Sequence, residues 1–304
     1  MSDYIIKPAS RKAVRPLIGL FAESGCGKTY SSLLLARGFV GEQGKIALVD
    51  SERGRGELYA DVIKGGYECL QLAEPFSPQN YIGAIDAVEQ AGFSIGIIDS
   101  ASHEWEGLGG VLDMAGDNES RSGRAGLHNW KTPKMEHAKF VLRMLQSSIP
   151  WIVCIRAKHK TRQLKENGKT AIVKDDYTTP IQADDFIFEM TAHGEIMADH
   201  SFRLTKCSHP ELRACFPEHQ PITTEHGAKL AAWCGGVATA LSAREIMAAI
   251  FKRSGLASSK DKIKNAEALK AWLIDHGVVM DMEDLSAATL ERWQEIKAVV
   301  EDLP

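Results

Sequence analysis

The residues whose types and spacing most clearly indicate a chemical function lie in the segment Leu17–Thr29, which reads LIGLFAESGCGKT. An apolar run is followed by a loop that contains two glycines, and a helix-forming stretch begins at Lys28. Backbone N–H groups in such a loop and at the start of the helix can bind phosphate. Lys28 can reach the outer phosphates of a nucleotide, and the Thr29 hydroxyl can be a ligand of Mg²⁺. The segment predicts a phosphate-binding loop (P-loop), with nucleotide contacts from Glu23, Ser24, Gly25, Cys26, Gly27, Lys28, Thr29 and Tyr30.

Two acidic residues follow apolar runs and could serve the same chemistry. Asp99 directly follows the run 94–98, and a carboxylate beside a P-loop can hold Mg²⁺ through water. Glu52 follows the run 45–49, from where a carboxylate can orient the water that attacks the outer phosphate. The plain alternatives are a strand-end aspartate and a solvent-exposed loop glutamate. Tyr59, seven residues after Glu52, could stack on adenine or be an ordinary core or surface tyrosine.

The elements that must position these residues alternate between short apolar runs and helix-length segments. This alternation predicts an α/β fold with a parallel sheet covered by helices. The expected strands are 17–21, 45–49, 68–72, 94–98 and 151–155, and the expected helices are 29–43, 78–91 and 133–147.

The following segment predicts antiparallel strands that extend the sheet. We expect a meander over 185–191, 195–199 and 201–206, with turns at His193-Gly194 and Asp199-His200. We also expect a hairpin over 160–174, because Asn167-Gly168 favours a tight type I′ turn.

Gly235-Gly236 marks a predicted boundary between a core domain, 1–235, and a helical C-terminal domain, 236–304. Three helices are expected there. Ser242 and Glu245 form a capping-box pattern before the first, at 246–251. The others are 266–276 and 286–303, and the last places Leu290, Trp293, Ile296 and Val300 on one apolar face.

Composition limits the possible functions. The 304 residues are 44% hydrophobic with a net charge of −4, so the chain as a whole is not a polybasic nucleic-acid binder. The six cysteines show no CxxC spacing, which gives no zinc signature. There is no run of 18 apolar residues and no signal-peptide pattern, so we expect a cytoplasmic protein without a membrane partner.

Several motifs together resemble the RecA recombinases. The stretch 44–60, GKIALVDSERGRGELYA, is similar to the RecA region that carries the catalytic glutamate and the adenine-stacking tyrosine, with the same spacing between them. Glu23-Ser24 in the P-loop, the IIDS run ending at Ser100, and Arg203–Lys206 followed by Pro210 and Phe216 are also similar. The resemblance covers about residues 14–220, and the group it most resembles is the phage RecA-like ATPases of the Sak type, which assist single-strand annealing and recombination.

The resemblance implies a RecA-like core and roles for single residues. Glu52 would be the general base or position the attacking water, Asp99 and Thr29 would hold Mg²⁺, and Lys206 would cap ATP across a subunit interface. RecA has a γ-phosphate-sensing glutamine at the end of its fourth core strand, and this chain has Arg156 nearby. Arg156 could contact phosphate or pair with an acid.

In RecA-like cores, two loops bind DNA, and the second corresponds here to 156–180. Seven basic residues and one acid, Glu166, lie between Arg156 and Lys174. A local basic patch can follow a phosphate backbone, although it could also be a solvated hairpin face. We expect DNA contacts from Lys158, Lys160, Arg162, Lys165 and Lys169. The first loop would be 117–130, where Trp130 could stack on a base or pack at the start of the next helix.

The sequence thus predicts a Mg²⁺-dependent ATPase that binds single-stranded DNA and acts in recombination by annealing or strand pairing. Its expected partners are single-stranded DNA, further copies of itself in a ring or filament, and a single-strand-binding or other recombination protein. Two alternatives stay open. One is a ring-forming translocating ATPase, a helicase or packaging motor, and the other is an ATP-switched mediator or scaffold with little turnover.

Overall fold

A computed structural model describes residues 14–166, 169–235 and, towards the C-terminus, 247, 250–251, 253–256, 262–279, 285 and 290–301. The chain divides into two units, Met1–Val237 and Ala238–Pro304, and each contains buried hydrophobic clusters of its own. The predicted capping box at Ser242 and Glu245 lies outside the described residues.

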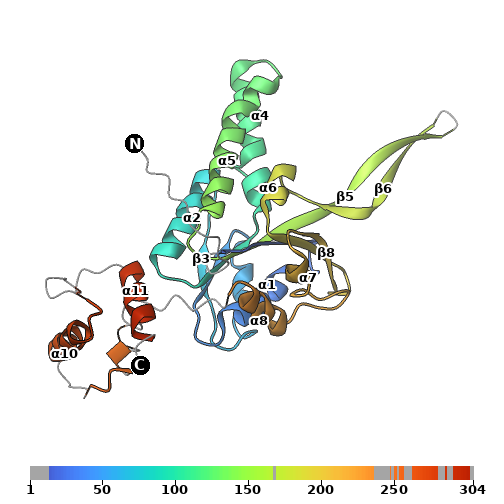
Figure 1. Cartoon of the computed structure of the whole chain (residues 1–304). Helices are drawn as coiled ribbons and strands as arrows, with labels where there is room; N and C mark the ends of the chain where they lie inside the picture. The colour runs from blue at the N-terminus through green and yellow to red at the C-terminus, as the bar shows by residue number, and fades with distance from the viewer. Residues whose placement is uncertain are drawn as a thin grey trace. The chain divides into compact units, whose positions relative to one another are not determined.

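The first unit is built on an eight-stranded sheet with the order β3-β2-β4-β5-β1-β7-β8, in which β6 pairs with β5 (Figure 1). Pairs from β3 to β7 are parallel, and the β5–β6 and β7–β8 pairs are antiparallel. The predicted α/β class, with a mostly parallel sheet and an antiparallel extension, is confirmed. The strands are β1 Leu17–Ala22, β2 Ile46–Asp50, β3 Glu68–Gln71, β4 Ile95–Asp99, β5 Trp151–Glu166, β6 Lys169–Pro180, β7 Ala192–Ile196 and β8 Phe202–Cys207.

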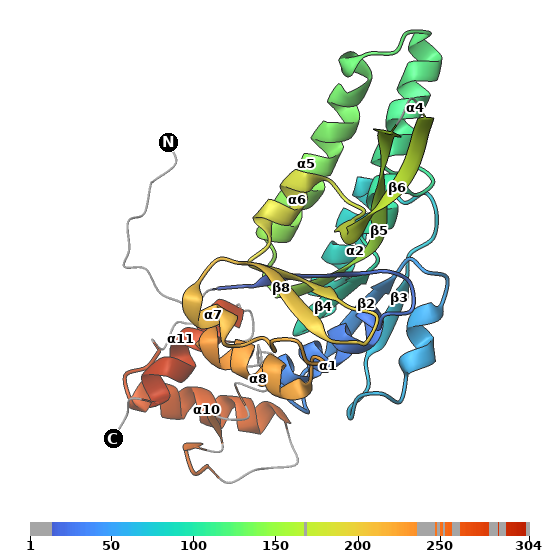
Figure 2. The same ribbon diagram turned by 90° about the vertical axis from the view of Figure 1, so that its right-hand side faces the viewer.

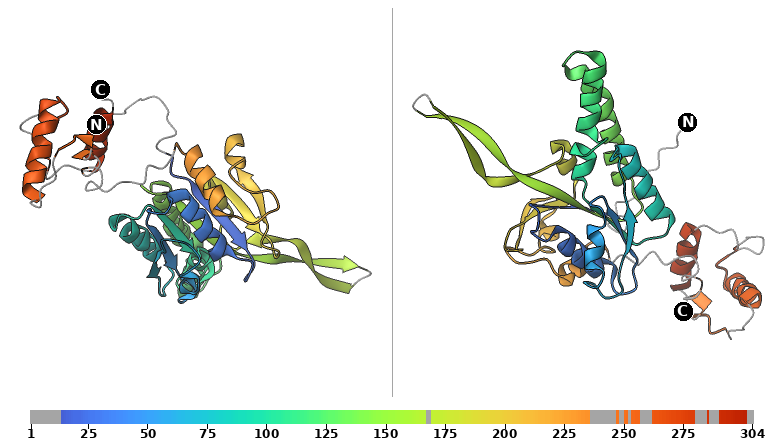
Figure 3. Two further views of the ribbon diagram at one scale, coloured as in Figure 1. Left: turned by 90° about the horizontal axis from the view of Figure 1, so that it is seen from below. Right: turned by 180° about the vertical axis from the view of Figure 1, so that it is seen from behind.

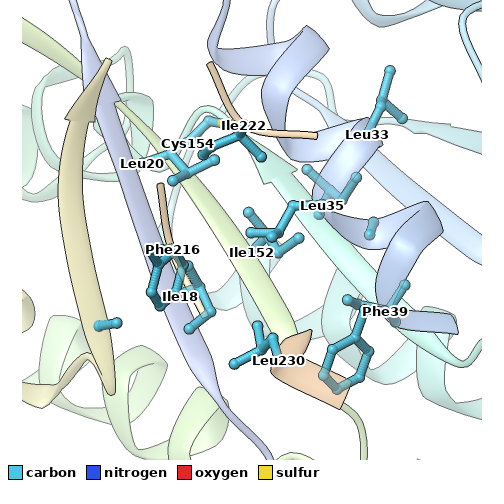
Figure 4. Packing of buried hydrophobic residues seen from close by; sticks show 14 of the residues in the cluster. Ile18, Leu20, Leu33, Leu35, Phe39, Ile152, Cys154, Phe216, Ile222 and Leu230 are labelled. Atoms are coloured by element: carbon cyan, nitrogen blue, oxygen red, sulfur yellow. The ribbon is translucent and has the colours of Figure 1, made fainter. Parts of the chain in front are cut away.

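Helices cover both faces of this sheet, because side chains of successive strand residues point to opposite sides. Ile18 and Leu20 of β1 join a buried cluster with α1 (Lys28–Val40) and α8 (Thr224–Trp233). Figure 4 shows Leu35 of α1 near Ile152 of β5, and Phe39 of α1 near Leu230 of α8, in this cluster. On the other face, α2 (Pro78–Gln90) and α5 (Lys131–Leu145) contribute to a second cluster with Leu17 and Phe21.

The parallel register brings the carboxyl ends of β1, β2 and β4 to one edge, at the level where β5 leaves the sheet. Asp50 of β2 lies opposite Asp99 of β4, and Ala22 of β1 lies opposite Arg156 of β5. The loops that leave these strand ends therefore meet, and they are the loops in which the sequence placed its candidate nucleotide residues.

The β5–β6 hairpin extends beyond the sheet (Figures 1 and 3). β5 continues from the sheet into the hairpin without a break, and the pairing shifts register between His159 and Thr161. The two strands of the predicted hairpin are confirmed, whereas its turn at 167–168 lies outside the described residues.

A pair of helices, α4 (Val111–Ser122) and α5, projects from the same unit (Figure 2). The expected loop 117–130 is therefore wrong in its first part, since 117–122 complete α4 and η3 (Leu127–Trp130) follows. Glu119 and Arg121 are common helix formers, and Gly123 ends α4 in a left-handed conformation, with φ 64°.

The expected strand at 185–191 is also wrong, because 185–189 belong to α6 (Asp184–Glu189). Asp184 and Asp185 lie in the first turn, where the helix dipole favours negative charge. Phe186 is buried and Phe188 is exposed, whereas a strand would place both rings on one face.

The expected turn at His193-Gly194 lies inside β7, next to an irregularity in its pairing with β8. A Cβ at Gly194 would lie 2.2 Å from the Phe202 ring, so this glycine allows close packing between strands. The turn is at 198–200, which confirms the expected Asp199-His200 turn.

The short elements of this unit are η2 Arg55–Tyr59, α3 Ser102–Glu106 and α7 Pro210–Arg213. The second unit contains α10 (Lys262–Asp275) and α11 (Leu290–Glu301). Trp293, Ile296 and Val300 are buried in its core, as the periodicity of this segment predicts.

Candidate nucleotide-binding site

The predicted P-loop joins the end of β1 to the start of α1. Gly25 and Gly27 adopt φ values of 86° and 95°, in the left-handed region that glycine tolerates best. The first helical hydrogen bond runs from the Ser31 N–H to the Gly27 carbonyl, at 2.9 Å. The N–H groups before it have no partner within the helix and are free to bind an anion.

A pocket of about 860 Å³ opens over this loop. It is formed by the P-loop, the segment after β2, residues before α2, α3 and the end of the sheet part of β5. Its lining residues are Ser24, Gly25, Gly27, Lys28, Thr29, Ser51, Glu52, Arg53, Arg55, Leu58, Tyr59, Glu74, Phe76, His103 and Arg156.

Lys28 is directed back over its own loop. Its ammonium group donates to the carbonyl oxygens of Ala22, at 3.2 Å, and Glu23, at 3.1 Å. The side chain is nearly buried yet lines the pocket. It therefore presents a preorganised positive charge where loop N–H groups would bind phosphate.

Thr29 and Asp99 form the candidate Mg²⁺ position. The Thr29 hydroxyl donates to Asp99 Oδ2 at 2.5 Å, while the buried Asp99 Oδ1 has no partner among the described residues. Burial raises the pKa of Asp99 to about 7. This orphaned oxygen fits a hydrated cation, which would satisfy it directly or through water. The described residues contain no cluster of three or more His, Cys, Asp or Glu side chains able to hold a metal, so phosphate and water would complete the coordination.

Glu52 is held in the pocket by a neighbour that sequence reasoning missed. The buried Asp50 carboxylate accepts the Glu52 N–H at 2.6 Å and the Gly56 N–H at 2.9 Å. These two hydrogen bonds hold both ends of the loop 52–56 against Asp50. Arg55 Nη1 lies 3.7 Å from Glu52 Oε2, so the carboxylate is only loosely paired and faces the pocket.

Tyr59 and Tyr30 lie at the side of the site. Their rings are 6.5 Å apart, edge to face. Tyr59 lines the pocket and is partly buried, whereas Tyr30 is exposed at its border. Both predicted tyrosines are thus brought together, with Tyr59 closer to the space that a base would occupy.

A hydrogen-bond network connects Arg156 to the loop after β2. The Ser51 hydroxyl donates to the Ser100 carbonyl and lies 2.8 Å from His103 Nδ1, so Nδ1 carries the hydrogen and Nε2 can accept from Arg156 Nη1, at 3.4 Å. Burial, followed by the charge of Arg156, lowers the pKa of His103, which agrees with a neutral ring. His103 stacks on Phe76, with ring centroids 5.0 Å apart.

His200 supports the P-loop from the β7–β8 turn. Its Nδ1 donates to the Cys26 carbonyl at 3.0 Å, and a Cβ on Gly27 would lie 3.3 Å from the same nitrogen. No local sequence pattern indicates this contact, because 174 residues separate the partners.

Four predicted nucleotide residues do not contribute side chains to the pocket. Cys26 is buried, Tyr30 borders the site, and Glu23 Oε1 lies 3.7 Å from His159 Nε2. Lys206 donates to the carbonyl oxygens of Phe188 and Met190, the latter at 2.7 Å, and does not line the pocket of its own chain.

The predicted DNA contacts lie on the β5–β6 hairpin. Lys158 and Lys160 are exposed, and Lys158 Nζ lies 3.6 Å from Glu106 Oε2. Arg162, Lys165 and Lys169 belong to hairpin strands whose side chains lie outside the described part, so their DNA contacts stay a prediction.

Comparisons with known proteins add little to this geometry. No protein-family model and no curated protein matches the sequence. Among solved structures, the chain is similar to an ATPase from the type III secretion system of pathogenic bacteria, with 15% identity over 94% of this chain and 79% of that chain. The TM-score is 0.36. No helix in the described part of the chain has the length and apolar character needed to cross a bilayer.

Proposed function

We propose that the chain is a Mg²⁺-dependent ATPase of the RecA-like type. The observation that carries this proposal is the convergence of Lys28, the Thr29–Asp99 pair, Glu52 and Tyr59 on one pocket over a P-loop. A phosphate loop alone would support nucleotide binding. The added carboxylate, opposite the loop and held by Asp50, supports hydrolysis.

In the proposed reaction, water attacks the γ-phosphate in line with the leaving oxygen. Glu52 orients this water and accepts its proton, while Lys28 and the loop N–H groups stabilise the charge on the phosphoryl oxygens. A Mg²⁺ held by Thr29 and Asp99 would neutralise the charge that develops between the phosphates. Arg156, which lines the same pocket, would contact the γ-phosphate.

We further propose that ATP lies at an interface between copies. Lys206 does not line the pocket of its own chain, and by the RecA resemblance it would cap the nucleotide of a neighbouring subunit after leaving the Phe188 and Met190 carbonyls. The assembly would act on single-stranded DNA through the basic hairpin, as a Sak-type annealing or recombination ATPase, together with a single-strand-binding or other recombination protein.

The experiment is an ATPase assay with single-stranded DNA, with duplex DNA and without DNA, at two salt concentrations. Stimulation by single strands is expected, and Lys28→Ala should abolish turnover. Stimulation by duplex DNA would favour a translocating motor. Slow turnover that DNA leaves unchanged would favour an ATP-switched mediator, and either result would contradict the proposed activity.

A charge-reversed variant tests the DNA surface separately. Lys160→Glu with Arg162→Glu should remove the stimulation by single-stranded DNA. The variant should also bind DNA with a weaker salt dependence: the slope of log Kobs against log salt concentration should become less steep by about 0.7 for each lost phosphate contact. The control, Lys45→Glu with Lys229→Glu, changes net charge equally at exposed sites elsewhere. Equal DNA affinity in both variants would show that the hairpin is only a solvated face.

A further inference from the structure

A second pocket, of about 550 Å³, lies among α3, η3, α5 and α6 and shares no lining residue with the nucleotide pocket. Its walls are largely aromatic and apolar, and among them lie two aspartates, one lysine and one histidine, so acidic groups outnumber the lysine. The lining residues are Trp105, Leu127, Trp130, Lys134, His137, Ala183, Asp184, Asp185 and Phe188.

His137 lines this pocket as a buried polar group with an unused hydrogen-bonding atom. Its Nδ1 lies 3.0 Å from Oε1 and 3.1 Å from Oε2 of the fully buried Glu104. Gln182 Nε2 donates to Glu104 Oε2 at 3.3 Å, which agrees with a carboxylate that accepts from His137 Nδ1–H. His137 Nε2 is buried and has no hydrogen-bond partner among the described residues, and Asp185 Oδ1 is 4.0 Å away. In the neutral ring this nitrogen accepts a hydrogen bond, so it suits an N–H donor.

The pocket rim exposes apolar area that would be costly to leave in water. Leu127 is 89% exposed and Phe188 is 71% exposed, and both line the pocket. Large exposed apolar side chains around a concave site are typical of binding surfaces. The two indoles and the aspartates also suit a cation, through cation–π and charge interactions. The occupant should therefore combine apolar side chains with a lysine or arginine.

The first thirteen residues of the chain, MSDYIIKPASRKA, have this combination. Tyr4, Ile5 and Ile6 are apolar and precede Lys7, while Arg11 and Lys12 add further positive charge. Asp3 is the one acidic residue of the segment, so its net charge is positive. The segment is thus complementary to the pocket in apolar character and in charge.

The point where this segment joins the fold is also close to the pocket. The Leu17 N–H donates to Thr191 Oγ1 at 3.1 Å, and the Thr191 N–H donates to the Leu17 carbonyl at 2.8 Å. Thr191 follows α6, which carries Phe188 and Asp185. Thirteen extended residues span at most about 45 Å, which is enough to reach the pocket from this position.

We propose that this pocket binds residues 1–13 of the same chain, with Tyr4, Ile5 and Ile6 against the aromatic walls and Lys7 at Asp185 and His137 Nε2. The proposal does not depend on ATP hydrolysis. It gives the N-terminal residues a defined docking site, where they cover Leu127 and Phe188.

Photo-crosslinking of the full-length chain tests this docking. The variant Leu127→p-benzoylphenylalanine should give crosslinks that mass spectrometry maps to residues 1–13, and Phe188→p-benzoylphenylalanine is an independent second position. The control position, Leu145, is exposed on α5 but does not line the pocket, and it should give none. Lys7→Glu should lower the crosslink yield several-fold, and adding Asp184→Lys and Asp185→Lys should restore part of it.

The proposal would be overturned by crosslinks from positions 127 and 188 that avoid residues 1–13, by equal yields from position 145, or by a yield that Lys7→Glu leaves unchanged. Crosslinking a mixture of isotopically light and heavy protein shows whether residues 1–13 come from the same chain or from a second copy. Crosslinks within one isotope support docking in the same chain, whereas mixed-isotope crosslinks would also overturn the proposal, because they would show that a second copy supplies the segment.

Discussion

At the residue scale, the candidate nucleotide site is assembled from side chains of separate elements: Lys28 and Thr29 of α1, Glu52 after β2, and Asp99 of β4. Lys28, Thr29 and Asp99 could be predicted because they belong to short motifs with a known relation to strand ends. The roles of His103 and His200 were harder to predict from the sequence, since each residue acts through a partner that is remote in the chain. Asp50 was visible in the sequence, but its role depends on a loop conformation that spacing does not reveal.

We predict that Asp50 controls turnover by positioning Glu52. Asp50→Ala leaves the Glu52 and Gly56 N–H groups without their acceptor, and kcat should fall about tenfold or more, because a small displacement of a catalytic group is costly. The KM for ATP should change little, since the P-loop contacts remain. Steady-state kinetics measure both values. Asp61→Ala, at an exposed position, is the control, and an unchanged kcat in Asp50→Ala would contradict the role.

His193 should make the fold sensitive to acid. Its Nδ1 lies 2.9 Å from the Thr205 hydroxyl, which itself donates to the His193 carbonyl, and its buried Nε2 has no partner in the described structure. Burial, assisted by the charge of Lys206, lowers the pKa of His193 to about 4.

Because the pKa of His193 is lowered in the folded chain, acid destabilises the fold. Between about pH 6.5 and 4, the unfolded chain binds a proton that the folded chain excludes, so the free energy of unfolding falls as pH falls. The loss reaches up to about 3 kcal/mol near pH 4, from roughly 1.4 kcal/mol for each pH unit. Urea unfolding at several pH values should show a weaker pH dependence for His193→Asn than for the wild type. His128→Asn, at an exposed histidine, should leave the wild-type dependence intact, and a matching change there would argue against His193.

At the element scale, the parallel strands were predictable because each is a short apolar run between helix-length segments. The errors fall where local patterns are ambiguous. The sequence of α6, DDFIFE, alternates aromatic residues like a strand, yet its acidic start and one-sided burial fit a helix. The His193-Gly194 pair predicts a turn, whereas the glycine is needed because a Cβ at position 194 would collide with the Phe202 ring.

The β5–β6 hairpin should be separable from the core that folds around the sheet. Its strands pair mainly with each other and extend beyond the sheet (Figure 1). Replacing residues 161–176 with a short Asn-Gly turn should therefore change the free energy of unfolding by less than about 1 kcal/mol. The same variant should lose stimulation by single-stranded DNA while keeping basal ATP turnover. A large loss of stability, measured by urea unfolding, would show that the hairpin is part of the core.

At the scale of the whole molecule, the first unit contains every residue that lines the nucleotide pocket. Its sheet has hydrophobic clusters on both faces, and the second unit has a separate cluster. The sequence predicted this change in character near Gly235-Gly236 from its shift to helical patterns. What the second unit binds could not be predicted, because its sequence contains amphipathic helices without a chemical motif.

We therefore predict that a chain ending at Val237 folds and hydrolyses ATP within about threefold of the full-length rate, since its pocket is complete. Cooperative unfolding, followed by circular dichroism, and steady-state turnover test this. Loss of cooperative unfolding would mean that the second unit stabilises the first. A folded but inactive truncation would mean that residues beyond 237 take part in the reaction.

The central claim is that the P-loop and Glu52 together form a hydrolytic site. The most direct test compares Glu52→Gln with Glu57→Gln, because Glu57 is an exposed carboxylate nearby that does not line the pocket. Glu52→Gln should bind Mg²⁺-ATP with nearly wild-type affinity and lose about 100-fold or more in single-turnover hydrolysis, which is the range for a general base. Glu57→Gln should hydrolyse at the wild-type rate. Wild-type hydrolysis by Glu52→Gln would contradict the account.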